Sequence, residues 1–133
     1  MATVSTLDTL NPAQRAAARY GERAAGNAFR AGPLLIIAGA GTGTGKTNTL
    51  AHRVAHLVQE GVNPQRILLL TFTRRAAVEM TRRAQRIVGE VREEVKLPWS
   101  GTFHSIANRL IRRYAVRVGL DANFSVRKRL FAP

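Results

Sequence analysis

The apolar and polar positions of this 133-residue chain alternate between short apolar runs and segments with helical periodicity. The apolar runs are residues 33–39 (PLLIIAG), 66–72 (RILLLTF) and 99–103 (WSGTF), and we expect each to form a short strand, the first two buried. Strands that alternate with helices in this way predict an α/β fold, with right-handed crossovers and a parallel sheet.

Amphipathic helices are predicted over residues 46–61, 74–89 and 104–119, where apolar residues recur at helical spacing. Gly61 and Gly119 are expected to end the first and the last of these helices. The positions expected to face the core are Leu50, Val54, Leu57 and Val58, then Ala76, Ala77, Met80, Ala84, Ile87 and Val88, and finally Ile106, Leu110, Ile111, Tyr114 and Val118.

The N-terminal part of the chain precedes this alternating pattern. We expect residues 1–9 to be disordered and residues 11–20 to form a helix, with Asn11 as its cap and Pro12 in its first turn. Residues 21–32 are expected to be a loop or a broken helix. At the other end, residues 127–133 are a basic tail.

A glycine-rich segment lies between the first predicted strand and its helix. Counted back from the lysine, it reads Ala40-Gly41-Thr42-Gly43-Thr44-Gly45-Lys46-Thr47, which is a Walker A loop with alanine in place of the first glycine. Successive backbone N–H groups at a helix N-terminus form an anion-binding concavity, and glycines permit its dihedral angles. We expect Lys46 to reach the β- and γ-phosphates of a nucleotide and Thr47 to hold Mg²⁺ through its hydroxyl.

The net charge of +13, from 21 basic and 8 acidic residues, points to a polyanionic partner. Eighteen of the basic residues are arginine, whose planar fork suits phosphate. Nucleic acid is the expected partner, and the alternative is that a GC-rich coding sequence supplies arginine for solubility.

Other classes are excluded or disfavoured by composition. The chain has no apolar span of 18 residues, so we expect no membrane segment, and its N-terminus lacks the pattern of a signal peptide. It has no cysteine, which fits a cytoplasmic protein. The oligomeric state is left open.

Four stretches stand in an order and spacing that resemble the UvrD/Rep family of superfamily 1 DNA helicases. They are LNPAQRAA, LLIIAGAGTGTGKTNTLAHRVAHLV, RILLLTFTRRAAVEM and WSGTFHSIANRLIRR, and the resemblance covers about residues 9–126. It implies that residues 10–126 form the N-terminal part of a UvrD-like ATP-binding domain, a partial RecA-like P-loop NTPase lobe. The implied activity is that of an ATP-dependent DNA helicase and ATP hydrolase, 3′–5′ in direction, that unwinds DNA or acts in its repair.

The resemblance also implies roles for individual residues. The implied cofactors are ATP and Mg²⁺, with Gln14 reading the adenine, and the implied partner is single-stranded DNA. Phe72 would stack on a base, and Arg74-Arg75 stand where the family usually has Asn-Lys. The implied DNA-binding residues are Thr71, Phe72, Thr73, Arg74, Arg75, Thr102 and His104.

The glycine-rich loop departs from the family pattern, which reads AGAGTGKT or AGAGSGKT, by one additional Thr-Gly pair. Aligned from Lys46, the loop is intact except that Thr42 replaces an alanine, and Ala38-Gly39 extend the strand. Aligned from Ala38, two residues bulge into the loop and displace its N–H groups. We favour the first alignment, because it keeps the amides nearest the helix in register.

The chain contains no Asp-Glu pair after an apolar strand, although this family takes its second Mg²⁺ anchor and its catalytic base from such a pair. We therefore expect the chain to be truncated before this Walker B motif and to be inactive as an enzyme on its own. The alternative is a non-catalytic nucleic-acid-binding or regulatory module that has lost nucleotide hydrolysis. A small nucleotide kinase fits less well, because no lid is evident.

Overall fold

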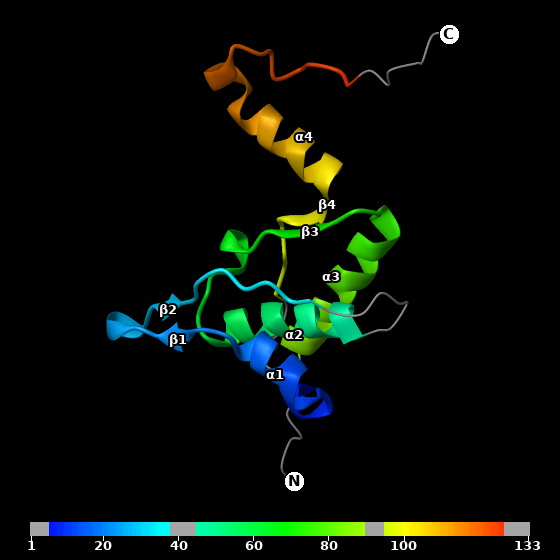
Figure 1. Ribbon diagram of the computed structural model, residues 1–133. Coiled ribbons are helices and arrows are strands. Elements are labelled where there is room, and N and C mark those ends of the chain that lie inside the picture. The colour runs from blue at the N-terminus through cyan, green and yellow to red at the C-terminus, as the bar shows by residue number, and fades with distance from the viewer. Residues whose placement is uncertain (1–5, 38–44, 90–94, 127–133) are drawn as a thin grey trace.

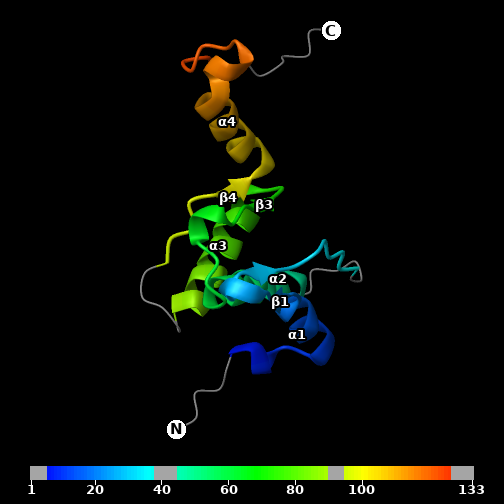
Figure 2. The same cartoon turned by 90° about the vertical axis from the view of Figure 1, so that its left-hand side faces the viewer.

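A computed structural model of the protein describes residues 6–37, 45–89 and 95–126, and these residues form a mixed α/β structure (Figure 1). Helices α1, α2 and α3 gather in one body, and α4 projects away from it beyond the small parallel sheet (Figure 2). The elements in chain order are η1 Thr6–Thr9, α1 Pro12–Arg19, β1 Glu22–Arg23, η2 Ala25–Asn27, β2 Phe29–Arg30, α2 Gly45–Gln59, η3 Pro64–Arg66, β3 Leu69–Thr71, α3 Arg74–Gly89, β4 Ser100–Thr102, α4 Phe103–Tyr114 and η4 Ala115–Val118, where η denotes a 3-10 helix.

The parallel sheet consists of β3 and β4, joined by a crossover through α3. Its register pairs Leu69 with Ser100 and Thr71 with Thr102, so both strands end at the same level. The predicted parallel relation between the second and third apolar runs is confirmed, although each strand has only three residues. The turns that follow β3 and β4 therefore lie at one edge of the sheet.

The first predicted strand is not formed. Residues 33–37 run without strand pairing, and the side chains of Leu35 and Ile37 are 83% and 88% exposed. An apolar run is buried in a sheet only when neighbouring strands supply hydrogen bonds along its edges. Among the described residues β3 pairs with β4 and no strand flanks 33–37, so the prediction of a buried strand is wrong for this structure.

The N-terminal region is more regular than expected. A capping box at Asn11 starts α1, as predicted, with Pro12 in the first turn. Instead of a loop or broken helix, residues 21–32 contain an antiparallel hairpin in which β1 and β2 flank η2. Gly26 makes this tight connection possible, because its φ of 81° is strained for other residues. Within the segment expected to be disordered, Thr6–Thr9 forms a 3-10 helix.

The hydrophobic core lies where α2 packs against α3, and side chains before and within β3 complete it. Val58 of α2 and Val88 of α3 are almost wholly buried, and each contributes roughly 1.5–3 kcal/mol through the hydrophobic effect. The predicted inward face of α3 is confirmed except for Ala76, which is exposed. Ala76 shares its face with Met80, four residues later, but it lies in the first turn of α3, at the end of the helix.

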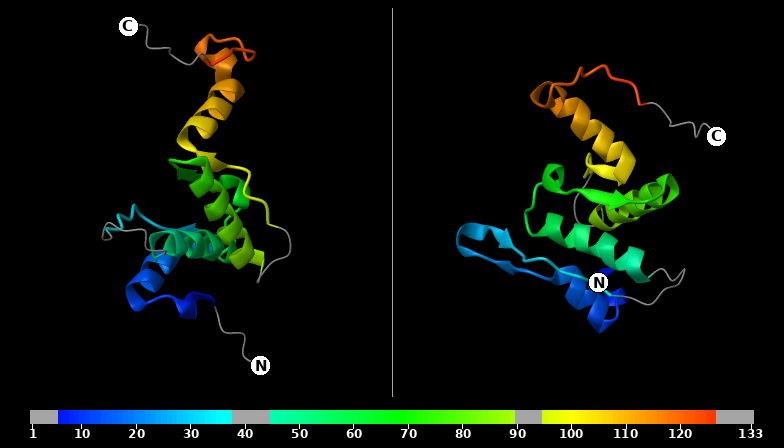
Figure 3. Two further views of the ribbon diagram at one scale, coloured as in Figure 1. Left: turned by 90° about the vertical axis from the view of Figure 1, so that its right-hand side faces the viewer. Right: turned by 45° about the horizontal axis from the view of Figure 1, so that its top comes forward.

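The last helix differs most from its predicted packing. Of the five apolar residues expected to face inward, Ile106 is buried, whereas Leu110, Ile111, Tyr114 and Val118 are between 39% and 64% exposed. Helix α4 ends at Tyr114, η4 continues to Val118, and Gly119 terminates it with a φ of 75°. Figure 3 shows α4 standing clear of the α1–α3 body, so most of its apolar face lacks a partner among the described residues.

Candidate functional site

The N-terminal end of α2 carries three of the residues predicted to bind nucleotide. Gly45 starts the helix, Lys46 is exposed and Thr47 is half-buried, whereas residues 40–44 of the predicted loop lie outside the described residues. The first N–H groups of a helix have no partner within it and favour an anion. Thr49 does not compete for this position, because its hydroxyl donates to the Gly45 carbonyl at 2.7 Å.

Gln14 lies beside this helix end although it belongs to α1. The N–H of Asn11 donates to Gln14 Oε1 at 3.1 Å, which fixes the side chain in the capping box of α1. A Cβ atom at Gly45 would come within 2.9 Å of Gln14 Nε2. The structure therefore brings Gln14 against the first residue of α2, and the absence of a side chain at Gly45 leaves room for its amide.

Arg53 joins the two helices that carry these residues. Its guanidinium donates to the carbonyl of Ala18 at 3.2 Å and to that of Tyr20, both at the end of α1. Its charge also lies 5.8 Å from the centre of the Phe29 ring. Burial lowers the pKa of Arg53, with an opposing contribution from Tyr20, but a guanidinium stays charged at neutral pH. Sequence reasoning missed this residue, which sits on the polar side of an otherwise ordinary amphipathic pattern.

The carboxyl ends of β3 and β4 bring two aromatic residues together. Phe72 follows β3 and is 87% exposed, while Phe103 follows β4 and is 46% exposed. Their ring centroids lie 5.1 Å apart at an interplanar angle of 38°. Phe72 is thus placed in solvent at the predicted DNA-binding edge and not in the core. Sequence reasoning missed Phe103; the parallel register places it beside Phe72, because the residue after Thr102 matches the residue after Thr71.

Three predicted DNA-binding threonines make local hydrogen bonds at the same edge. Thr73 Oγ1 accepts from the Ala76 N–H at 3.1 Å, and Thr102 Oγ1 accepts from the Ser105 N–H at 3.2 Å. Each of these hydroxyls caps the helix that follows it. The Thr71 hydroxyl donates to the Thr73 carbonyl at 3.2 Å. In this structure the threonines shape the two turns that carry the phenylalanines.

The basic residues of the two turns are open to solvent. Arg74 and Arg75 are exposed in the first turn of α3, and His104 is exposed in the first turn of α4. Trp99, which precedes β4, is half-buried beneath Arg109, whose guanidinium lies 4.4 Å from the ring centre. The edge therefore offers aromatic surface and positive charge together, the combination that binds single-stranded nucleic acid.

The two predicted sites open toward the same side of the molecule. In Figure 1 and in the right-hand view of Figure 3, the N-terminal end of α2 lies on the side toward which β3 points. Parallel α/β structures bind their ligands at this side, beyond the carboxyl ends of the strands.

Within residues 6–37, 45–89 and 95–126, no helix is long and apolar enough to cross a membrane.

Comparison with known proteins gives a consistent result. Residues 12–130 match the UvrD/REP helicase N-terminal domain. The ATP-dependent DNA helicase PcrA of Staphylococcus epidermidis is 49% identical over 96 residues, and PcrA of Staphylococcus aureus is 48% identical over 96 residues. In each case the match covers 71% of this chain and 12% of the relative. The chain thus spans about an eighth of the length of these relatives.

Proposed function

Since the chain belongs to the UvrD/Rep helicase family, we propose that it forms the ATP-binding and DNA-contacting front part of the first RecA-like lobe of a 3′–5′ DNA helicase. The observation that carries the nucleotide part of this proposal is the placement of Gln14 Nε2 beside Gly45, at the helix end that presents Lys46. The proposal includes a cytoplasmic location and a role in unwinding DNA for repair.

The described residues fit the parts of MgATP. The backbone N–H groups at Gly45 and the Lys46 ammonium would hold the phosphates, and the Thr47 hydroxyl would hold Mg²⁺. The Gln14 amide can both donate and accept, as the adenine edge requires. Bound ATP supplies the phosphoryl transfer that drives helicases. Arg53 ties the end of α1 to α2, the two helices that carry Gln14 and Gly45.

The aromatic pair at the sheet edge supports the DNA part of the proposal. Phe72 and Phe103 offer a continuous aromatic surface on which bases of any sequence can stack. Arg74 and Arg75 lie two and three residues after Phe72, within reach of the phosphates that flank a stacked base. Single-stranded DNA is therefore the proposed partner, since its bases are unpaired and can stack on the aromatic rings.

Titration calorimetry with MgADP tests the nucleotide part. Lys46→Ala is expected to abolish binding, because it removes the side-chain cation from the cradle. Lys96→Ala is the matched control, since it removes the same charge from an exposed residue outside the site and should leave binding unchanged. Equal binding by the wild type and Lys46→Ala would refute nucleotide recognition through this loop.

The same titration separates the proposal from its alternative, a nucleic-acid-binding module without nucleotide binding. The observation that favours this alternative is the exposure of Arg74, Arg75, Phe72 and Phe103, which needs no nucleotide. A chain that binds single-stranded DNA but takes up no MgADP at millimolar concentration would support the alternative.

A further inference from the structure

Helix α3 presents a row of arginines that continues beyond the predicted DNA-binding turn. Arg75, Arg82 and Arg86 are spaced as i, i+7 and i+11, so they lie within about 40° of one another around a helix of 3.6 residues per turn. All three are exposed. The opposite side of the helix is the buried side, which holds Met80 and Ala84 against α2.

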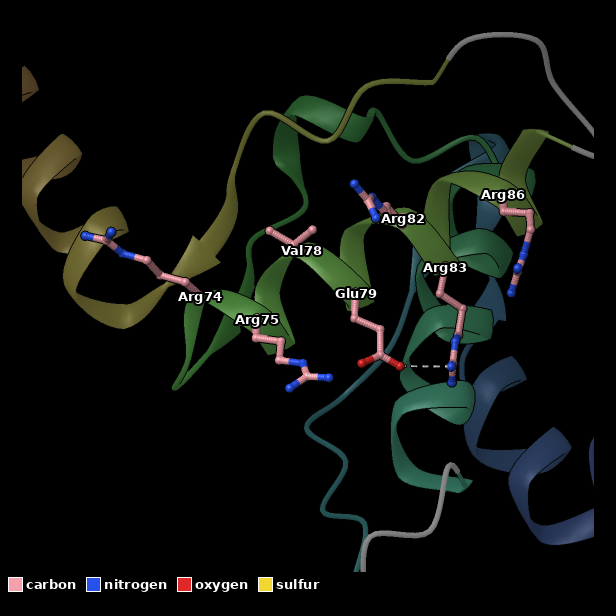
Figure 4. Close-up of a pocket in the computed structure, with 7 residues that line it drawn as sticks. All are labelled: Arg74, Arg75, Val78, Glu79, Arg82, Arg83 and Arg86. Atoms are coloured by element: carbon pink, nitrogen blue, oxygen red, sulfur yellow. Dashed lines mark hydrogen bonds and ion pairs between the residues drawn. The ribbon is translucent and has the colours of Figure 1, made fainter.

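The one acidic residue of α3 does not cancel this charge. Glu79 falls between Arg75 and Arg82, but its carboxylate binds the guanidinium of Arg83 at 3.1 Å (Figure 4). Arg83 is more deeply placed than Glu79, with 19% of its side chain exposed against 58%. The charges of Glu79 and Arg83 therefore cancel each other. Arg75, Arg82 and Arg86 have no other acidic residue on their own helix to pair with.

The arginines border a shallow, open hollow on the outer side of α3. The hollow has a volume of about 640 Å³, is lined along α3 from Arg74 to Arg86, and has Val78 within it. Figure 4 shows the arginine side chains spreading from the helix around this space. A second hollow of about 520 Å³ shares Arg74, Val78 and Arg82 and reaches β4 at Gly101. We call the two adjoining hollows together the groove; it reaches Thr102, the residue before Phe103, although neither phenylalanine lines it.

The dimensions of the row fit a nucleic-acid backbone. From Arg75 to Arg86 the helix rises roughly 16 Å, at about 1.5 Å per residue. Phosphates of a stacked strand follow one another at about 3.4 Å along the axis, so roughly five phosphates match this length. Arginine binds phosphate through two parallel hydrogen bonds, and Val78 can contact the sugars between them.

We propose that the arginine row Arg75, Arg82 and Arg86 of α3 is a second DNA contact, which holds the phosphate backbone of the strand whose bases stack at Phe72. The proposal rests on the proposed function, because it extends the path of the same strand. The arginine row would bind DNA without preference for its base sequence. The length of DNA that the chain binds should therefore exceed the length that the ends of β3 and β4 alone can contact.

Fluorescence anisotropy with the full 133-residue chain and two lengths of oligothymidylate tests this. One oligomer of about 4 nucleotides covers only the aromatic pair, and one of about 16 nucleotides covers the groove as well. Arg82→Ala with Arg86→Ala should weaken binding of the long oligomer roughly tenfold and reduce its log–log salt slope by about 1.4, which corresponds to two phosphates. Binding of the short oligomer should change little.

Two variants control for charge and for folding. Arg30→Ala with Arg66→Ala removes the same charge from exposed residues outside the groove and should leave the affinity for the long oligomer within twofold of the wild type. Arg82→Lys with Arg86→Lys keeps the charge and should restore most of the salt slope.

The proposal is wrong if the Arg30/Arg66 pair weakens binding as much as the Arg82/Arg86 pair, because the charge then acts only as a diffuse field. It is also wrong if polyglutamate of similar charge displaces the long oligomer as well as unlabelled DNA does, because the groove would then fit an acidic protein. Failure of the proposed function gives a different result, namely that Phe72→Ala leaves binding of the short oligomer unchanged.

Discussion

The rings of Phe72 and Phe103 lie 5.1 Å apart, centroid to centroid, although they belong to different strand–helix turns. They meet because β3 and β4 pair in register and end together at Thr71 and Thr102. Neither ring is needed for the core, which lies between α2 and α3. Two large apolar side chains exposed at the end of a parallel sheet are therefore our proposed contact for a ligand.

Substitution of either ring should weaken binding of single-stranded DNA. Phe72→Leu and Phe103→Leu are each expected to cost roughly 1–3 kcal/mol of binding free energy, the usual value for one stacked base. The salt slope should stay nearly constant, because no phosphate contact is lost. Anisotropy titrations at several salt concentrations measure both quantities.

The matched control for the aromatic pair is Tyr114→Leu, which removes a ring of similar exposure from the far end of α4. It should bind DNA as the wild type does. Circular dichroism must first show that each variant keeps its fold. If Tyr114→Leu then binds DNA as weakly as Phe72→Leu does, the sheet edge has no special role in DNA binding.

The contact between Gln14 and Gly45 can be tested by a double-mutant cycle. Gly45→Ala places a Cβ where it would meet Gln14 Nε2 at 2.9 Å, and the flexible side chain is expected to move aside. MgADP affinity should fall in the wild-type background and fall less in a Gln14→Ala background, with a coupling of about 0.5–3 kcal/mol. Additive effects would show that the contact between Gln14 and Gly45 plays no part in nucleotide binding.

Much of this arrangement could be predicted from the sequence, because it rests on local patterns. Asn11 and Pro12 mark the start of α1, the helical spacing of apolar residues predicts α2 and α3, and short apolar runs predict β3 and β4. The prediction failed where burial depends on partners distant in the chain. Leu35 and Ile37 are as apolar as the residues of β3, yet no strand flanks them in the part of the chain described.

The candidate site divides in the same way. Glycine, lysine and threonine in a fixed order predict a phosphate-binding helix end, and this stays a prediction. Residues 40–44 lie outside the described residues, which leaves the two loop alignments undecided. Phe103 and Arg53 could not be found, because the register of a sheet places one and the packing of two helices places the other. Neither the sheet register nor the helix packing produces a periodic pattern that can be recognised in the sequence.

Steady turnover of ATP by this chain is expected to stay at background, with or without single-stranded DNA. None of its eight acidic residues follows an apolar strand as part of an Asp-Glu pair, so we expect the chain to lack the second Mg²⁺ anchor and the base for water that such a pair supplies. A phosphate-release assay measures this, with Lys46→Ala as the blank. DNA-stimulated release that depends on Lys46 would reveal an unrecognised catalytic acid.

Stability should fall as the pH drops below about 6.5, and His56 should account for part of the loss. Burial lowers the pKa of His56; Glu60 opposes this effect, while Arg53 and Arg19 add to it. With a folded pKa below the unfolded value, the unfolded chain takes up the proton first, so protonation favours unfolding. The loss begins near the unfolded pKa and is complete below the folded one.

Urea unfolding of His56→Gln and His104→Gln at about pH 7.5 and about pH 5.5 isolates this contribution, because the two pH values bracket the ordinary pKa of histidine. His56→Gln should lose less stability between the two values than the wild type, while the exposed His104→Gln should behave like the wild type. Identical pH dependence in all three proteins would rule out His56 as the titrating group.

The unpaired run Leu34-Leu35-Ile36-Ile37 has a consequence for how the chain behaves in concentrated solution. Four consecutive apolar residues with β-branched members, no charge and at least 44% exposure are what intermolecular strand pairing requires. Two copies of the chain can satisfy these backbone groups against each other. Self-association is therefore expected to rise with protein concentration. The mutual repulsion of chains with a charge of +13 opposes it. Because salt screens this repulsion, added salt should promote aggregation.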